Sequence, residues 1–371
     1  MRESKTRKMK TESKAVGNKR ICMVGGGRVG RLHTSIIAKH LGDRATVTAL
    51  VEPDEATATR LADDYHVAHT YASLTEALDS QDFDGVVITT PTFTHRDLTL
   101  AAFRAGLSVH LEKPMAMNVI ECLEITEAQQ KAGVQLQLGF MRRFDRDFKN
   151  AAALLASGDI GDPMIIKSLT HGPGLPPAWA NDIRTSNGLI AEVTSHDLDT
   201  ASWFAGAAPT EITVKAANFK GASRGVSTPH FYDTMLATVV FETGALASIA
   251  GVCPADYGYD ARVEVTTTGG MIQVGDTGPG GLSVVKAGSG NKGESTYRSW
   301  RDRFAEAYVT EMTSFIDAID GHAPPAGATE GLQAAALVEG GVLSLLEART
   351  VLVSDVMDKP QIPYWQEGSS R

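Results

Sequence analysis

One short stretch of the chain ends in a residue that could assist proton transfer. In VHLEKP, residues 109–114, an apolar run predicts a buried strand. Pro114 cannot continue a central strand, so we expect the strand to end at Lys113 and to deliver its ammonium group to a pocket. A lysine held there could donate a hydrogen bond to a substrate hydroxyl and favour its alkoxide, although a lone lysine at a strand end is usually just solvated.

A second stretch, EVTSHDLD at residues 192–199, is expected to be helical. Glu192, His196 and Asp199 are separated by four and then three positions, so a continuous helix would present them on one face. Imidazole titrates near neutral pH, which makes His196 a candidate general base. The positive charge of Lys113 would keep that imidazole neutral and able to accept a proton. Together these residues could take the proton of an alcohol.

A dinucleotide could accept the hydride that such an oxidation releases. GGGRVGRLH at residues 25–33 lies between an expected strand at 21–25 and an expected helix, which is the context of the dinucleotide-binding turn. Glycines allow the tight turn, close approach to a pyrophosphate and close helix packing, and the helix terminus offers free N–H groups. The residues expected to contact the cofactor here are Gly25, Gly27, Arg28, Val29 and Gly30.

Glu52 follows the next expected strand, 22 positions beyond Gly30. A carboxylate there can accept hydrogen bonds from the adenosine ribose and would repel a 2′-phosphate. The sequence therefore predicts NAD rather than NADP as the cofactor. Further strand–helix units up to residue 140 predict a doubly wound parallel sheet.

Ligands of such sheets bind where the strands end, and several polar residues occupy these positions. Thr90, Pro91 and His95 follow one strand, and we expect them to border the cofactor, although His95 could equally serve the start of a helix. Arg142 and Arg143 follow the last strand. We expect Arg142 to reach the cofactor and Arg143 to reach the substrate, with plain surface charge as the alternative.

The rest of the chain predicts a second domain of a different kind. Strand-like runs at 211–219, 234–242, 245–253 and 261–270 follow one another without long helices, as in a large, mostly antiparallel sheet. Two helices are expected at about 301–320 and 330–348. We expect a disordered basic tail over 1–19, a cofactor domain over 20–141, and a domain for substrate binding and oligomerisation over 142–371.

Composition restricts the function classes. A net charge of −9 argues against nucleic acid as the main partner, and no apolar window is long enough to span a bilayer. Three widely spaced cysteines form no metal-spaced cluster and suit a reducing cytoplasm. We expect a cytoplasmic protein.

The motifs GGGRVGRLH, TTPTFTH (89–95), LEKP (111–114) and GFMRRFD (139–145) together resemble the glucose–fructose oxidoreductase/inositol dehydrogenase (Gfo/Idh/MocA) family. GFMRRFD and DYGYD (256–260) look most similar to its inositol 2-dehydrogenase branch. The resemblance implies a Rossmann domain, an α/β domain whose open sheet forms dimers or tetramers, and oxidation of a cyclitol or pyranose alcohol to a ketone.

The resemblance also implies roles for single residues. It makes Lys113 and His196 the catalytic pair and lets Glu112 contact the cofactor ribose, with a structural salt bridge as the alternative for Glu112. Related dehydrogenases usually carry aspartate four residues before the histidine, where this chain has Glu192, so either the pocket is rearranged or the hydroxyl that it binds differs. Substrate contacts are expected from Lys113, Arg143, Glu192, His196, Asp199 and Tyr259. Asp199 could equally be a solvated residue of the helix face, and Tyr259 could instead pack in the core or at a subunit contact.

Other functions and ligands are compatible with the same residues. Glu192, His196 and Asp199 could bind zinc or manganese, but we favour a site without metal because Lys113 can serve as the electrophile. A sugar-modifying enzyme with tightly held NAD, acting by transient oxidation in epimerisation or glycosidic cleavage, is one alternative. A dinucleotide-binding sensor without catalysis is another, although such relatives tend to lose the lysine or the histidine.

Overall fold

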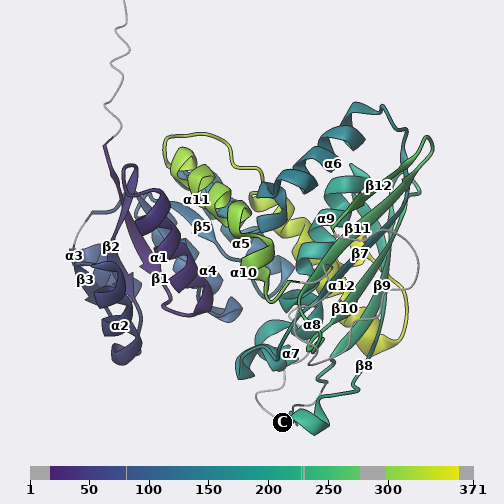
Figure 1. Cartoon of the computed structure of the whole chain (residues 1–371), viewed down its shortest axis with the longest axis horizontal. Coiled ribbons are helices and arrows are strands. Elements are labelled where there is room, and N and C mark those ends of the chain that lie inside the picture. The colour runs from purple at the N-terminus through teal and green to yellow at the C-terminus, as the bar shows by residue number, and fades with distance from the viewer. Residues whose placement is uncertain (1–16, 81, 227, 229, 276–296, 359–371) are drawn as a thin grey trace, which may run out of the picture.

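The computed structural model describes residues 17–80, 82–226, 228, 230–275 and 297–358. The basic tail predicted for residues 1–19 therefore lies almost entirely outside the described residues. Two sheets organise the rest of the chain, and Figure 1 shows them side by side, each with its own helices.

Six parallel strands form the first sheet, in the order β3-β2-β1-β4-β5-β6. These strands are β1 (Lys19–Val24), β2 (Ala45–Val51), β3 (His69–Tyr71), β4 (Gly85–Ile88), β5 (Ser108–Leu111) and β6 (Leu136–Leu138). The strand order reverses between β1 and β4, which is the switch point where doubly wound sheets bind their ligands. This confirms the predicted Rossmann architecture.

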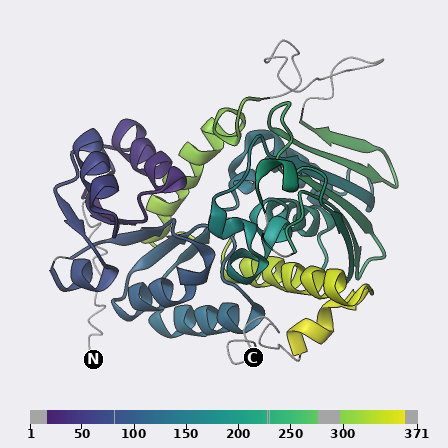
Figure 2. The ribbon, with the colours of Figure 1, turned by 90° about the horizontal axis from the view of Figure 1, so that it is seen from below.

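Helices cover both faces of this sheet, which is why β4 and β5 are buried along their whole length. The connecting helices are α1 (Arg28–His40), α2 (Glu55–Tyr65), α3 (Leu74–Ser80), α4 (His95–Arg104) and α5 (Val119–Ala132). A later helix, α11 (Ala305–Ile319), packs against α1 and β5, and Figure 2 shows it in light green beside the purple α1. A helix that follows most strands of the second sheet in the sequence thus completes the first domain.

The second sheet has seven strands in the order β12-β11-β7-β10-β9-β8-β13, and only β7 and β10 are parallel neighbours. The strands are β7 (Pro163–His171), β8 (Pro209–Ala217), β9 (Thr234–Phe241), β10 (Leu246–Val252), β11 (Asp260–Thr267), β12 (Met271–Val274) and β13 (Val351–Leu352). The sheet is therefore mixed and mostly antiparallel, as predicted. β7 was not expected, because its apolar Met164 and Ile165 are both exposed and disturb the alternation.

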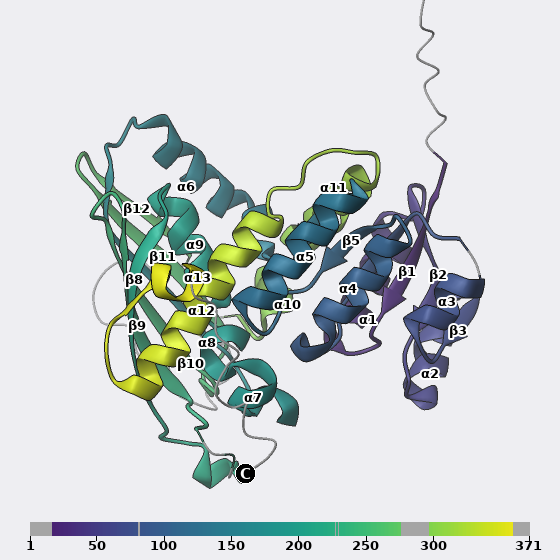
Figure 3. The ribbon, with the colours of Figure 1, turned by 180° about the vertical axis from the view of Figure 1, so that it is seen from behind.

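Helices pack on one side of the second sheet. Those that contact its strands are α6 (Arg146–Ser157), α8 (Gly188–Glu192), α9 (Ser195–Ala205), α12 (Ala328–Glu347) and α13 (Val353–Asp358). The short helices α7 (Ile183–Ser186) and α10 (Trp300–Arg303) contact mainly other helices. Figure 3 shows α12 between the second sheet and α5, and it contacts both β8 and α5. This helix joins the two halves of the molecule.

The expectation of one continuous helix through residues 192–199 is wrong. Helix α8 ends at Glu192, and α9 starts at Ser195. The β-branched residues Val193 and Thr194 favour helix weakly, and the Thr194 hydroxyl bonds back to the Ile190 carbonyl at 2.9 Å. Glu192 therefore stands on a different helix from His196 and Asp199, and its direction is set by tertiary packing.

Candidate active site

Lys113 lies where β5 has ended, at the carboxyl edge of the first sheet. Its Nζ donates a hydrogen bond to the backbone carbonyl oxygen of Glu192 at 2.9 Å and lies 3.9 Å from the Oε2 of that residue. The two side chains are 12% and 13% exposed, so the pair is mostly shielded yet open to a ligand. Lys113 of the first domain therefore contacts the carboxyl end of α8 in the second domain.

Glu192 also contacts the first domain through Thr92, whose hydroxyl donates to Oε1 at 3.2 Å. Burial raises the pKa of this carboxyl, while Lys113 and the Thr92 hydrogen bond act in the opposite direction. A carboxyl group held between a hydroxyl and an ammonium group can orient a substrate hydroxyl. Thr92 was not among the predicted site residues, because nothing in sequence spacing connects it to a position 100 residues later.

His196 lies in the first turn of α9, with its ring 6.2 Å from that of Phe140 in an edge-to-face arrangement. Burial, followed by the charges of Lys113 and Arg142, holds the pKa of His196 well below its ordinary value. The imidazole is therefore neutral at physiological pH and can accept a proton. Its Nδ1 is buried and has no hydrogen-bond partner in the described part of the chain.

A narrow recess adjoins Glu192, and its lining includes neither Lys113 nor His196. It is lined by Pro176, Ala180, Asn181, Gly188, Leu189, Glu192, Val193, His230, Phe231, Tyr232 and Cys253. Pro176 belongs to HGPGLPPAW, the stretch at residues 171–179. The segment 230–232 was not predicted as part of the site, since it lies between strands and has no motif of its own.

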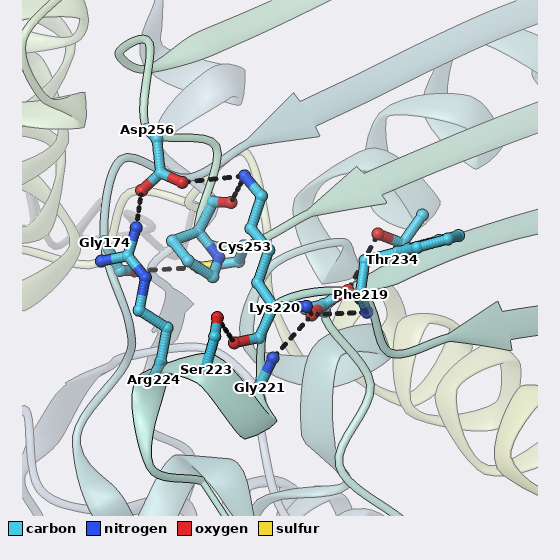
Figure 4. A network of polar contacts seen from close by, with 11 residues as sticks. Gly174, Phe219, Lys220, Gly221, Ser223, Arg224, Thr234, Cys253 and Asp256 are labelled. Carbon is cyan, nitrogen blue, oxygen red and sulfur yellow. Dashed lines mark hydrogen bonds and ion pairs between the residues drawn. The ribbon is translucent and has the colours of Figure 1, made fainter. Parts of the chain in front are cut away.

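A network of polar contacts, drawn in Figure 4, includes Cys253, which lines this recess. The Cys253 thiol donates to the Gly174 carbonyl at 3.0 Å, which ties the proline-rich stretch to the end of β10. Asp256 accepts from Lys220 at 2.9 Å and from Arg224 at 2.6 Å. The network therefore joins three separate loops.

The glycine turn fits a dinucleotide phosphate group. Gly25 has a φ of +100°, which favours glycine, and a Cβ on Gly30 would lie 1.9 Å from the Gly25 carbonyl oxygen. A Cβ on Gly27 would have no atom of the described chain within 4 Å, so the space beside this residue is open. Gly27 is also the N-cap of α1, and no described side chain accepts a hydrogen bond from the first N–H groups of the helix. The N–H groups of Arg28 and Val29 are thus placed at a helix start without a cap, as an anion requires.

Glu52 lies beside this turn, one residue past β2. Its Oε2 accepts from the Gly26 N–H at 2.8 Å and its Oε1 from the Asp54 N–H at 3.0 Å. These two bonds fix the carboxylate next to the glycine turn, where a nucleotide ribose would lie. The geometry fits the predicted preference for NAD.

Thr90, Pro91 and His95 follow β4 at the same sheet edge. The His95 ring is buried and bridges two backbone carbonyls, with Nδ1 2.7 Å from the Pro114 oxygen and Nε2 2.9 Å from the Thr90 oxygen. It therefore ties the segment after β4 to the lysine loop. This contact gives His95 a bracing position behind the site.

Arg142 and Arg143 do not reach the positions expected from the sequence. Arg142 is 1% exposed and donates to Asp197 at 2.9 Å and to Thr170 at 2.6 Å. Arg143 donates hydrogen bonds from Nε and Nη2 to the carboxylate of Asp199, at 2.8–3.1 Å. Each guanidinium is already paired with a buried aspartate, because a buried charge must find a partner. Asp199 is thereby occupied as well, and it does not join Glu192 and His196 in a metal-ligating set.

Two further predicted contacts have other partners in the structure. Tyr259 is 4% exposed, its ring lies 6.3 Å from that of Phe304, and it belongs to the core rather than to the recess. Glu112 lies 2.9 Å from His33 through its Oε1. The geometry favours core packing for Tyr259 and a structural salt bridge for Glu112, which were the alternatives considered for these residues.

Comparisons with known proteins agree with this architecture. A family model described as "Oxidoreductase family, NAD-binding Rossmann fold" (GFO_IDH_MocA) matches residues 19–140, and "GFO/IDH/MocA C-terminal domain" matches residues 148–273. Inositol 2-dehydrogenase of Rhizobium meliloti is 30% identical over 344 residues, which cover 90% of this chain and 99% of that protein. "Uncharacterized oxidoreductase YrbE" of Bacillus subtilis is 30% identical over 331 residues, covering 87% and 93%.

Solved structures give the same picture. The myo-inositol dehydrogenase of Lactobacillus casei in complex with NAD(H) and myo-inositol is similar with a TM-score of 0.77 and 26% identity, covering 91% of this chain and 97% of that one. Within the described residues, no helix has the length and apolar character needed to cross a bilayer. With its glycine turn, its switch point and its matched domains, this chain is an NAD-binding oxidoreductase of the Gfo/Idh/MocA family.

Proposed function

We propose that this chain oxidises a secondary alcohol of a polyhydroxylated ring to a ketone, reversibly. The substrate class is a cyclitol such as an inositol, or a pyranose sugar or sugar derivative. The observation that carries the proposal is the meeting of Lys113 with Glu192, beside a neutral His196 and next to a recess. The inositol 2-dehydrogenase of Rhizobium meliloti and the myo-inositol dehydrogenase of Lactobacillus casei, both similar to this chain, support the substrate class.

The bound nicotinamide would accept the hydride from the carbinol carbon. Lys113 would donate a hydrogen bond to the reacting hydroxyl and stabilise the developing alkoxide, and its charge would keep His196 unprotonated. His196 would accept the hydroxyl proton as general base. Glu192 would hold a neighbouring hydroxyl of the ring and so select the orientation of the substrate.

Self-association through the seven-stranded sheet is part of the proposal. One side of the sheet packs against helices, and the opposite side exposes large apolar side chains: Ile165, Leu236, Leu246, Met271 and Leu352. An apolar surface of this kind is typical of an interface between protein chains. We therefore expect a homodimer or a homotetramer.

A substrate panel tests the proposed reaction. Inositol isomers, free sugars and nucleotide sugars are each supplied with NAD or NADP, and formation of the reduced nicotinamide is followed by absorbance. We expect turnover with at least one cyclitol or pyranose and a preference for NAD. Product formation without net reduction, together with cofactor that survives purification, would point to transient oxidation instead. Tight binding of NAD without turnover of any polyol would point to a sensor.

A further inference from the structure

A second group of titratable side chains is built around Glu112. His33 projects from α1, His110 from β5, Glu112 from the residue after β5, and Glu311 from α11. One nitrogen or carboxylate oxygen of each residue lies within 4.8 Å of the corresponding atoms of the others. All four residues are buried, and Glu112, the most exposed, is only 9% accessible.

The fold explains why these residues meet. His110 and Glu112 are two positions apart on extended chain, so their side chains leave the same face of the sheet. Helices α1 and α11 pack on that face, and the His33 ring lies 5.2 Å from the His110 ring. A Cβ on Gly139 would come within 2.8 Å of the Glu112 carboxyl carbon, so glycine at that position leaves room for the carboxylate.

Several ligand-type atoms of this group lack a protein partner. His33 Nδ1, His110 Nε2 and both carboxylate oxygens of Glu311 are buried and form no hydrogen bond within the part of the chain that the structure describes. The other imidazole nitrogens are held, His33 Nε2 by Glu112 at 2.9 Å and His110 Nδ1 by the Gln137 amide at 3.1 Å. A buried polar atom without a partner costs about 1–3 kcal/mol, so four of them in one place point to a missing ligand.

The charges of this group favour a cation. Within the described residues, no lysine or arginine forms an ion pair with Glu112 or Glu311. Two imidazoles and two carboxyl groups without a lysine or arginine partner in the described chain are a donor set that suits a divalent cation of the zinc type.

We propose that these four side chains form a binding site for a divalent transition metal ion of the zinc type. Zinc accepts imidazole nitrogen and carboxylate oxygen in four-coordinate sites that are closed by protein ligands. Ligand atoms in such a tetrahedral site are roughly 3.3 Å apart, so the widest pair here must close by roughly 1.5 Å, which side-chain torsions can supply. The ion would tie α1, β5 and α11 together behind the lysine loop. This site is separate from the set of Glu192, His196 and Asp199 considered from the sequence.

Metal binding by the full chain tests the proposal directly. The untagged protein is treated with a chelator, dialysed, and titrated with Zn²⁺ in equilibrium dialysis, and bound metal is measured by mass spectrometry. Co²⁺ is then used as a spectroscopic probe, since tetrahedral Co²⁺ gives intense visible absorption. We expect one tightly bound Zn²⁺ per chain and a tetrahedral Co²⁺ spectrum.

Three variants locate the ion. Glu311→Gln removes one ligand and keeps the side-chain volume, and His110→Phe replaces another ligand with a somewhat larger apolar ring. We expect at least a 100-fold weaker affinity for Zn²⁺ in both. Glu339→Gln changes another buried glutamate, which accepts from the Val119 N–H at 2.8 Å, and it should keep the affinity of the parent. Circular dichroism shows that each variant is folded. Parent protein without stoichiometric Zn²⁺, or equal affinity in folded Glu311→Gln, overturns the proposal.

Discussion

The ammonium group of Lys113 bonds to the backbone carbonyl of Glu192 at 2.9 Å, while the carboxylate of Glu192 stays 3.9 Å away. The backbone thus positions the lysine, and the carboxylate remains available to a ligand. The two residues come from different domains, so their contact is also a contact between the cofactor fold and the substrate fold. Function and domain packing are therefore coupled at this point.

Lys113→Met should lower kcat on the best polyol by about 10²- to 10⁴-fold, because it removes the donor that stabilises the alkoxide. Affinity for NAD, measured by fluorescence quenching, should change little. Lys131→Met is the matched control, since Lys131 is exposed and pairs with Glu127 on the surface of α5. Unchanged turnover in Lys113→Met would remove this lysine from the mechanism.

The oxidation rate should depend on pH through His196. Because burial and the charge of Lys113 lower its pKa well below the ordinary value, the imidazole is neutral above that pKa and protonated only in acid. We therefore expect kcat/KM for oxidation to rise with pH through an inflection below about 6.5 and then to level off. His196→Asn should lose this inflection and most activity, whereas exposed His322→Asn should keep both. An inflection that persists in residual activity of His196→Asn would assign it to another group.

Glu52 should control the choice between NAD and NADP. Glu52→Ala removes the carboxylate that is held beside Gly26, and with it the acceptor for ribose hydroxyls and the repulsion of a 2′-phosphate. We expect kcat/KM with NAD to fall by about 10-fold, which corresponds to about 1.4 kcal/mol, and activity with NADP to rise. Glu55→Gln, three positions later on α2, should leave the ratio unchanged. A ratio that stays constant in Glu52→Ala would contradict this role.

The Arg143–Asp199 pair should contribute to stability. Asp199→Asn leaves the Arg143 guanidinium buried without its anionic partner, and breaking a buried pair in this way costs about 3–5 kcal/mol. We expect a clear decrease in the midpoint of urea denaturation. The comparable change Asp182→Asn disrupts a surface pair with Arg184 and should cost at most about 1 kcal/mol. Similar midpoints for both variants would show that the buried pair is not needed.

The exposed face of the second sheet should mediate self-association. Leu236→Lys places a charge on the apolar surface, where Leu236 is 59% exposed near the start of β9. Light scattering coupled to gel filtration should show an oligomer for the parent and a smaller species for the variant. Leu154→Lys on α6 lies outside the sheet and should keep the size of the parent. A monomeric parent would exclude the interface.

Local chemistry made much of the first domain predictable. The glycines of the turn, the apolar strand before Lys113 and the acidic residue after the second strand each report a backbone requirement within a few positions. Strand–helix alternation then implies a parallel sheet, and a parallel sheet brings all strand ends to one edge. For this reason the lysine, the glycine turn and Glu52 could be assigned to one edge without coordinates.

Long-range packing decided the rest. Sequence spacing placed Glu192, His196 and Asp199 on one helix. In the structure the helix is interrupted at Thr194, and Asp199 forms an ion pair with Arg143. Arg142 looked like a ligand contact and is instead buried against Asp197. In each case the partner lies more than 50 positions away, and a buried charge takes whichever partner the fold supplies.

The sequence by itself determined the cofactor fold and the types of residue at the site, because turn geometry and strand burial are local requirements. Only the tertiary structure decided which side chains meet, namely Thr92 with Glu192, and His33 with Glu112. Those contacts join helices, strands and loops from distant parts of the chain. Their geometry follows from how the two sheets and their helices pack, which no local pattern encodes.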